Sequence, residues 1–420
     1  LMGRDDLGSR YLSVDRQKLV VNWHSKKVRK NTLLLSIATA DQATGYVFGV
    51  NVNFDPALDS ADVEKDMVRF GDHALARAFR RYARVWLPAD WNAAAERAAP
   101  RGGTSRKPME SVIEETYDAA LGRPDIEDGE GPANSSRAPV KGMLLHEQVV
   151  MYAHIQLVTR LLCRAKKIRF FTDQESGIRA AILTAVPKRV LDRTADAFYV
   201  KVLKDMSVDM KRALVGATKR RLARLAEKYG VTPEAAELLA AEEELARMVA
   251  IGKWGDRWFR HPISEMREPE KSVCWLTDID PVETEPDKRR LQLSHQALLH
   301  LKATLTAVDR FFMQVRRGLT LAERAVASAN TDRRLWFGKS AYNPEVLVKV
   351  LGIFRTYFNY CEVGRDGKTP AMRLGLARGP IAPEDILYFT PEPPERRRAP
   401  AARSLKPSGP VAHASESLAA

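Results

Sequence analysis

The order of the expected secondary-structure elements constrains this chain more than any other feature. Three β-rich runs come first, "YLSVDRQKLVV", "TLLLSIATAD" and "YVFGVNVNF", all within residues 11–55. Aromatic and β-branched residues in such runs favour strands. Later, the amphipathic helix "EQVVMYAHIQLVTRLLCRAKK" precedes a buried strand, "IRFFTD", and the helix "SGIRAAILTAVPKRVL" precedes a fifth strand, "DAFYVKVL". Strands that alternate with helices predict an α/β fold with five strands.

Two aspartates belong to these predicted strands. Asp15 lies inside the first strand, where a charged side chain is costly unless it is paired, caps a turn or binds a metal. The alternative is an aspartate that faces water on an edge strand. Asp173 ends the fourth strand, where α/β folds place their ligands. The alternative is an N-cap for the next helix, although Ser176 is equally suited to capping.

A third carboxylate is needed if these aspartates serve phosphodiester chemistry, in which two magnesium ions held by carboxylates neutralise the phosphoryl group. Asp309 stands in "TAVDRFFMQVRR", and Arg316 lies two turns later on nearly the same helix face. Glu323 and Glu345 are the other candidates. The alternative for Asp309 is a solvated helix face with local ion pairs.

Composition narrows the classes of function. The 420 residues include 67 Lys and Arg against 53 Asp and Glu, a net charge of +14, which favours a polyanionic partner; a basic surface without any partner is the alternative. Three dispersed cysteines indicate neither a disulfide framework nor a zinc site. The sequence contains no phosphate-binding glycine loop, no Ser-His-Asp signature and no apolar run of about 18 residues. We therefore expect a soluble protein of the cytoplasm.

The chain is long enough for two or three units or for one domain with insertions. The expected segments are a first part of the core (1–58), a helical stretch and linker (59–140), a second part of the core (141–204), a helical insertion whose core includes Trp254, Trp258 and Trp275 (205–290), a last core helix (291–330), a C-terminal helical segment (331–390) and a disordered tail (391–420). Because the chain begins at Leu1, we expect that an N-terminal domain precedes it.

Several stretches together resemble a bacterial insertion-sequence transposase of the DDE type. They are "LSVDRQKLVV", "LLLSIATADQATGYVFG", "IRFFTDQESGIRAA", "VDRFFMQVRR" and "YNPEVLVKVLGIFRTYFNY" with the following "DGKTPAMRLGLA". The resemblance covers most of residues 11–390. It implies an RNase H-like core with a five-stranded mixed sheet, interrupted by a mainly helical insertion. It also implies cleavage and strand transfer of DNA that depend on two Mg²⁺ ions, which Mn²⁺ can replace.

The resemblance assigns roles to individual residues. Asp15, Asp173 and Asp309 become the catalytic and metal-binding acids. On the last core helix the family usually has Asn, then Glu, then Lys or Arg, and this chain has Thr306, Asp309 and Arg316 at those spacings. The third acid is therefore Asp instead of Glu, and it follows Asp173 at an unusually long distance, which an insertion explains.

The resemblance also implies partners. These are double-stranded DNA, as transposon ends and as target, and further copies of the chain on that DNA, near the nucleoid of a bacterial cytoplasm and without a membrane. The DNA-binding candidates are Arg316 and Arg317 and the basic turn "HSKKVRKN" with Lys26, Lys27, Arg29 and Lys30, for which a solvated turn is the alternative. The rival functions are a nuclease that cuts without joining and an inactive DNA-binding remnant.

Overall fold

The computed structural model describes ten stretches of the chain. They are residues 1–22, 32–76, 79–87, 90, 141–175, 177–203, 206–251, 255–277, 293–323 and 339–389. The predicted basic turn, the linker at 96–140 and the tail at 391–420 lie outside these stretches. The chain divides into a unit spanning Leu1–Pro380 and a second unit that begins at Ile381, in which one short helix, α13 (Pro383–Leu387), is described.

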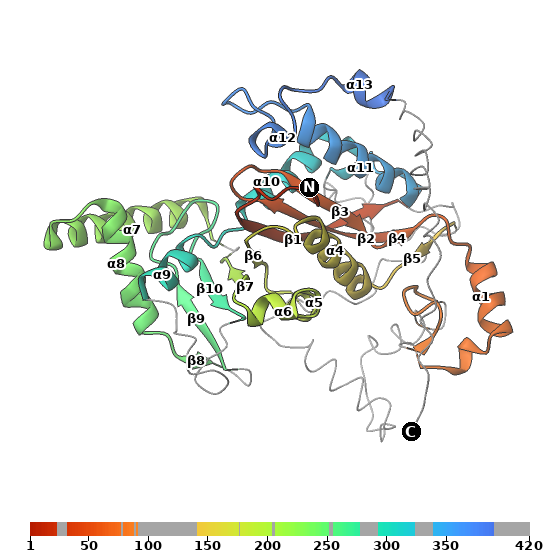
Figure 1. The fold of residues 1–420 in the computed structure, drawn as a ribbon, viewed down its shortest axis with the longest axis horizontal. Coiled ribbons are helices and arrows are strands. Elements are labelled where there is room, and N and C mark those ends of the chain that lie inside the picture. The colour runs from red at the N-terminus through yellow and green to blue at the C-terminus, as the bar shows by residue number, and fades with distance from the viewer. Residues whose placement is uncertain are drawn as a thin grey trace, which may run out of the picture. The chain divides into compact units, whose positions relative to one another are not determined.

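A large mixed sheet forms the centre of the first unit (Figure 1). Its eight strands, in spatial order, are β3 (Val47–Val52), β2 (Thr32–Asp41), β1 (Ser9–Val21), β6 (Lys167–Thr172), β7 (Ala195–Lys201), β10 (Ser272–Trp275), β9 (Asp256–Arg260) and β8 (Ala250–Ile251). β1 is parallel to β6, and β6 is parallel to β7. The other neighbours are antiparallel. All five predicted strands are present, and the α/β class is confirmed.

The prediction of five strands is wrong, because the segment expected to be a helical insertion adds three more. It begins with two helices, α7 (Val208–Tyr229) and α8 (Pro233–Ala246), and continues as β8, β9 and β10. β10 pairs with β7, so the sheet continues past the predicted edge strand. Trp258 on β9 and Trp275 on β10 pack against the hydrophobic core, whereas Trp254 lies outside the described residues. The helical pattern of the two preceding helices led to the prediction that the whole segment, including these short strands, is helical.

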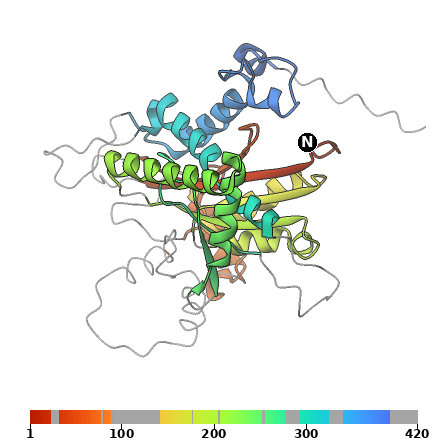
Figure 2. The same cartoon turned by 90° about the vertical axis from the view of Figure 1, so that its left-hand side faces the viewer.

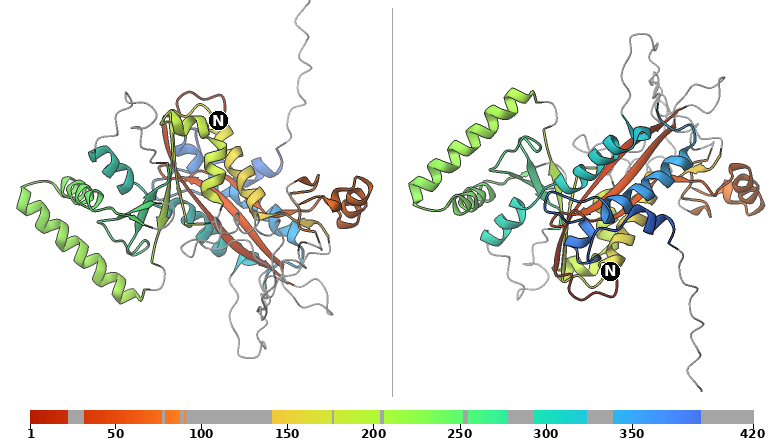
Figure 3. Two further views of the ribbon diagram at one scale, coloured as in Figure 1. Left: turned by 90° about the horizontal axis from the view of Figure 1, so that it is seen from below. Right: turned by 90° about the horizontal axis from the view of Figure 1, so that it is seen from above.

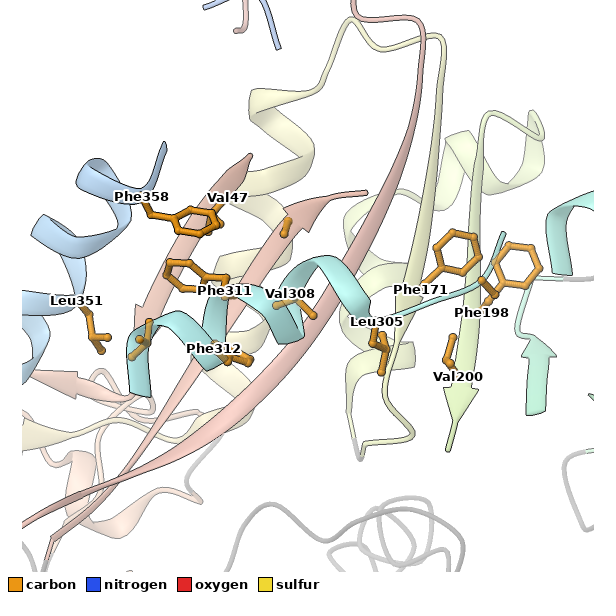
Figure 4. Close-up of a cluster of buried hydrophobic side chains, with 14 of the residues drawn as sticks. Val47, Phe171, Phe198, Val200, Leu305, Val308, Phe311, Phe312, Leu351 and Phe358 are labelled. Carbon is orange, nitrogen blue, oxygen red and sulfur yellow. The ribbon is translucent and has the colours of Figure 1, made fainter. Parts of the chain in front are cut away.

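Helices cover both faces of the sheet (Figures 1 and 3). On one face lie α4 (Glu147–Leu161), α5 (Ile178–Ala185) and α6 (Pro187–Leu191). On the other lie α10 (Thr306–Gly318) and α11 (Pro344–Tyr360), and α10 packs across β1 and β2. Figure 4 shows side chains of α10, among them Val308, Phe311 and Phe312, between that helix, the sheet and α11.

Alternation along the strands assigns each side chain to one of these faces. On β6, Phe170 packs in the cluster with α4 and α5, whereas its neighbour Phe171 packs in the cluster with α10. On β7, Tyr199 and Phe198 divide in the same way. The parallel strands are thus buried on both sides, as expected for strands covered by helices.

Three predicted helices are interrupted, each for a local reason. The helical stretch expected to begin at residue 59 ends early, as α1 (Ser60–Arg69), because Gly71 adopts a left-handed conformation before a short 3-10 turn, η1 (Asp72–Ala74). The helix expected at 176–191 is divided into α5 and α6 at Val186, directly before Pro187. The long helix expected from Leu291 consists of α9 (Leu293–Leu301) and α10.

Smaller elements complete the first unit. β4 (Phe54–Asp55) and β5 (Met143–Leu144) form a separate two-stranded sheet, η4 (Thr320–Ala322) follows α10, and α12 (Pro370–Arg373) follows α11. Asn359 of α11, in the "YFNY" end of the run "YNPEVLVKVLGIFRTYFNY", is buried and exchanges two hydrogen bonds of 2.9 Å with the backbone of Val47 on β3. That stretch therefore fixes α11 to the edge of the sheet.

Candidate active site

A pocket of about 560 Å³ opens on the α10 side of the sheet. It is lined by carboxylates and cations from separate elements, together with apolar side chains. The carboxylates are Asp15, Asp173, Glu175, Glu268, Asp309 and Glu323, and the cations are Arg16, Lys18, Arg267 and Arg316. All three aspartates expected to be catalytic thus border one cavity.

Strand register explains why Asp15 and Asp173 meet. The parallel pairing of β1 with β6 ends at Val14 opposite Thr172. The residues that follow directly after these two are Asp15 and Asp173. Neighbouring strands lie about 4.8 Å apart, and residues in the same register of a parallel pair point to the same face. That face is the one covered by α10, since the alternating residue Ser13 donates a 3.0 Å hydrogen bond to the carbonyl of Thr304, just before α10.

Asp15 occupies a central strand. β1 lies between β2 and β6, so the interpretation of Asp15 as a water-facing residue of an edge strand is wrong. Desolvation raises the pKa of its carboxyl group well above the ordinary value, and the negative charges of Glu175, Asp173 and Asp309 raise it further. The same three carboxylates therefore surround Asp15 closely enough to influence its ionisation.

Asp173 does not cap the following helix. Helix α5 begins at Ile178, and its N-cap position is Gly177, four residues beyond Asp173, without any side-chain capping bond. The Asp173 carboxylate instead accepts a 2.8 Å hydrogen bond from the backbone N–H of Gln174. The N-cap interpretation of Asp173 is therefore wrong, and Ser176, the other capping candidate, lies outside the described residues.

Gly177 shapes the turn between Asp173 and α5, with a φ of 79° in the left-handed region. We expect Gly177→Ala to lower the free energy of unfolding by about 1–2 kcal/mol, because a Cβ atom disfavours this conformation. An added Cβ meets only ordinary contacts there, at 3.7 Å from Gln148, so backbone strain is the cause. Urea denaturation measures the effect.

A matched substitution in a helix separates strain from the loss of a glycine. Gly352→Ala, inside α11 and with no atom within 4 Å of the new Cβ, should stabilise the protein by about 0.5–1 kcal/mol. Equal effects of the two substitutions would contradict the assigned role of Gly177.

Asp309 is an exposed residue in the first turn of α10. The start of this helix is held by buried Glu268, which accepts hydrogen bonds from the Thr304 hydroxyl at 2.6 Å and from the Leu305 N–H at 2.8 Å. Lys271 pairs with Glu268 at 2.8 Å. Although burial opposes ionisation of Glu268, the charge of Lys271 and these hydrogen bonds lower its pKa below the ordinary value.

The other candidates for a third acid occupy different places. Glu323, just after η4, also lines the pocket, where it is exposed and pairs with Lys339 at 3.3 Å. Glu345 lies in the first turn of α11, pairs with Lys349 at 2.5 Å and is not among the residues that line the pocket. The pocket therefore brings Asp309 and Glu323 near the first two aspartates and leaves Glu345 outside.

The basic residues predicted to bind DNA differ in whether they line the pocket. Arg316 lines the pocket, two turns after Asp309 on α10. Arg317 is exposed on the same helix and does not line the pocket. Lys26, Lys27, Arg29 and Lys30 lie outside the described residues. Thr306 begins α10, and its hydroxyl oxygen lies 2.7 Å from that of Thr304.

A buried charge cluster at the pocket wall was not predicted from the sequence. Arg16, next to Asp15 on β1, forms ion pairs with Glu147, the first residue of α4, and with Glu175. Less than a tenth of each of the three side chains is exposed. Arg16 thus connects the strand that carries Asp15 with the turn that follows Asp173.

The raised pKa of Asp15 predicts how stability depends on pH. An unfolded Asp ionises near pH 4, at about 3.9, and folded Asp15 ionises at higher pH. Its contribution to stability is therefore fully present below the unfolded pKa and is lost as the pH rises through the folded pKa. We expect Asp15→Asn to raise the melting temperature at pH 7.5, with a difference that disappears towards pH 4.

Thermal unfolding without divalent cations, from pH 4 to pH 8, measures this difference. Asp192→Asn is the control, because Asp192 is exposed and does not line the pocket. A lower melting temperature of Asp15→Asn at pH 7.5 would show that the charged form of Asp15 is stabilised in the folded protein, contrary to the prediction.

Comparison of the chain with models of protein families, with curated proteins and with solved structures gave no match. Within the described stretches, no helix is long and apolar enough to cross a membrane. No group of three or more His, Cys, Asp or Glu side chains in those stretches is arranged so that it could hold a metal ion.

Proposed function

We propose that this chain is a DDE-type DNA transposase, which cuts transposon-end DNA and joins it to a target in a reaction that requires Mg²⁺. One observation carries the proposal: Asp15, Asp173 and Asp309, from two strands and a helix, border one pocket, and the charges of the latter two raise the pKa of the first. Perturbed carboxylates that converge in a cavity are typical of functional sites.

The arrangement of the core supports the same proposal. Strands β3, β2 and β1 form an antiparallel meander, and β6 and β7 continue it in parallel beside β1, with helices on both faces. We infer that these five strands of the eight-stranded sheet correspond to the mixed sheet of an RNase H-like core. In this proposal, strands β8, β9 and β10, with α7 and α8, would be an insertion between the second aspartate and the helix of the third.

The donor set suits magnesium. Carboxylate oxygens are the ligands that Mg²⁺ prefers, and mutual repulsion among the pocket carboxylates is what a bound dication would relieve. Asp15, Asp173 and Asp309 are the residues that would hold the ions. Held by these carboxylates, two Mg²⁺ ions would supply activation of the attacking oxygen and stabilisation of the leaving oxygen. Since these side chains do not form a ready-made metal site, we expect them to approach one another when ions and DNA bind.

The cations of the pocket suit a phosphodiester substrate. Arg316 and Arg267 line the same cavity as the aspartates. A guanidinium group can bind two phosphate oxygens at once, so these side chains would orient the scissile phosphate towards the carboxylates. Glu268 would keep the beginning of α10, and with it Asp309, in place while the DNA is held.

A cleavage and joining assay tests the proposal. The substrate is a duplex that carries an inverted repeat from the DNA flanking the coding sequence, incubated with Mg²⁺, with Mn²⁺ and with a chelator. A transposase should cut at the repeat only with a divalent ion and should join a pre-cut end with a 3′-hydroxyl to a second duplex. Cutting without joining would instead identify a nuclease. The absence of both cutting and joining would contradict the proposal.

A further inference from the structure

Helix α7 presents a row of cations to solvent. None of its residues is buried, and α8 is its main contact (Figure 2). Its exposed cations are Arg212, Lys219, Arg220, Arg224 and Lys228. Successive residues of a helix are rotated by about 100°, so these five side chains occupy roughly one half of the helix surface.

The cations of α7 differ in their partners. Arg221, on the side towards α8, pairs with Glu244 at 3.1 Å and with Glu243 at 4.0 Å. For Lys219, Arg220 and Arg224, no carboxylate in the described part of the chain lies within ion-pair distance. The acidic helix α8 therefore neutralises one side of α7. The opposite side also carries two exposed carboxylates, Asp209, which pairs with Arg212 at 3.3 Å, and Glu227, but its five cations outnumber them.

Among the other exposed residues between Arg212 and Lys228, three are alanines and one, Glu227, is acidic. Ala217 and Ala223 are exposed, and Thr218 directs its hydroxyl to the carbonyls of its own helix, at 3.1 Å from Leu214 and 3.0 Å from Val215. The helix sequence contains neither Asn nor Gln, the amides best suited to reading adenine. Such a surface can approach a phosphate backbone closely without distinguishing base pairs.

We propose that the exposed face of α7 binds the phosphate backbone of double-stranded DNA without sequence specificity. The choice of DNA as the polyanion rests on the proposed function. The span from Arg212 to Lys228 is about 24 Å at 1.5 Å per residue. A DNA strand presents a phosphate about every 3.4 Å, so roughly seven phosphates of one strand lie along this distance.

Salt dependence of DNA binding tests this surface in the full chain. The variant carries Lys219→Gln, Arg220→Gln and Arg224→Gln, and the probe is a fluorescent 30-base-pair duplex of arbitrary sequence, titrated at several NaCl concentrations. Each lost phosphate contact lowers the slope of log K against log [NaCl] by about 0.9, so we expect a decrease of about 2–3 and an affinity about 100-fold lower at 0.1 M salt.

A matched variant controls for net charge. Lys65→Gln, Arg69→Gln and Lys188→Gln remove three exposed cations from α1 and α6, and this variant should keep nearly the original slope. Equal slopes for both triple variants would overturn the proposal, as would binding of the protein to phosphatidylglycerol vesicles in preference to the duplex. A second duplex of unrelated sequence should lose affinity by the same factor.

The result of this DNA-binding test does not depend on whether the protein cuts DNA. If α7 binds DNA but the protein does not cut it, the proposed function fails and the inference about α7 stands. If the protein cuts and joins DNA while the α7 variant binds with unchanged affinity and slope, the inference fails alone.

Discussion

Asp173→Asn is expected to abolish Mg²⁺-dependent cleavage of a cognate DNA end while the protein remains folded. The amide keeps the size of the side chain and can still accept the hydrogen bond from Gln174, but it lacks the charge that a metal ion requires. Loss of an outer partner of a metal ligand typically costs roughly 10–100-fold in activity, so we expect loss of the ligand itself to cost more.

The measurement is a time course of cleavage under single-turnover conditions, with binding of the same DNA measured in parallel. Binding should remain, since the cations of the pocket and of α7 are unchanged. Asp192→Asn provides the matched control, because it makes the same chemical change at an exposed position away from the pocket. Cleavage by Asp173→Asn at the original rate would show that the metal-site assignment is wrong.

Arg16→Met is expected to lower the free energy of unfolding by about 3–5 kcal/mol, because it leaves Glu147 and Glu175 buried without their cation. Methionine fills much of the same volume, so loss of charge pairing dominates over loss of packing. Urea denaturation at pH 7.5 measures the effect, provided that the unfolding curve shows a single transition.

Two further variants make this test specific. Arg247→Met removes an exposed arginine that pairs with Glu243 and Glu244, and it should change stability by less than about 1 kcal/mol. Combining Arg16→Met with Glu147→Gln and Glu175→Gln removes all three charges and should recover much of the stability lost by Arg16→Met alone. An effect of Arg16→Met as small as that of Arg247→Met would exclude a structural role for the buried charge cluster.

Local sequence patterns predicted the elements of the core closely. The run "TLLLSIATAD" coincides with β2, and Thr232 caps α8 with Pro233 in its first turn. Such signals work because they depend on residues a few positions apart, through side-chain alternation and capping bonds. Strands β9 and β10 were missed because they are short and become stable by joining the sheet: β10 pairs with β7, far away in the sequence, and β9 pairs with β10.

The residues of the candidate site also differ in whether a local sequence pattern or a contact between distant residues reveals them. Asp173 could be identified from the sequence because it follows an apolar run and precedes a helix. Glu268 could not, since its relevance comes from hydrogen bonds to Thr304 and Leu305, more than 35 residues later. Those bonds also explain why α9 and α10 are separate helices, although the apolar pattern predicted one.

The sequence by itself determined five of the eight strands of the sheet, and that an aspartate stands in the first strand and another directly after the fourth. These properties follow from backbone preferences and side-chain periodicity over short distances. Only the tertiary structure decided that Asp15 and Asp173 share a register, that Asp309 faces them across a pocket and that Arg16 holds two buried glutamates. The physical reason is that pairing of distant strands and burial of charge depend on the whole packed core, which no local pattern encodes.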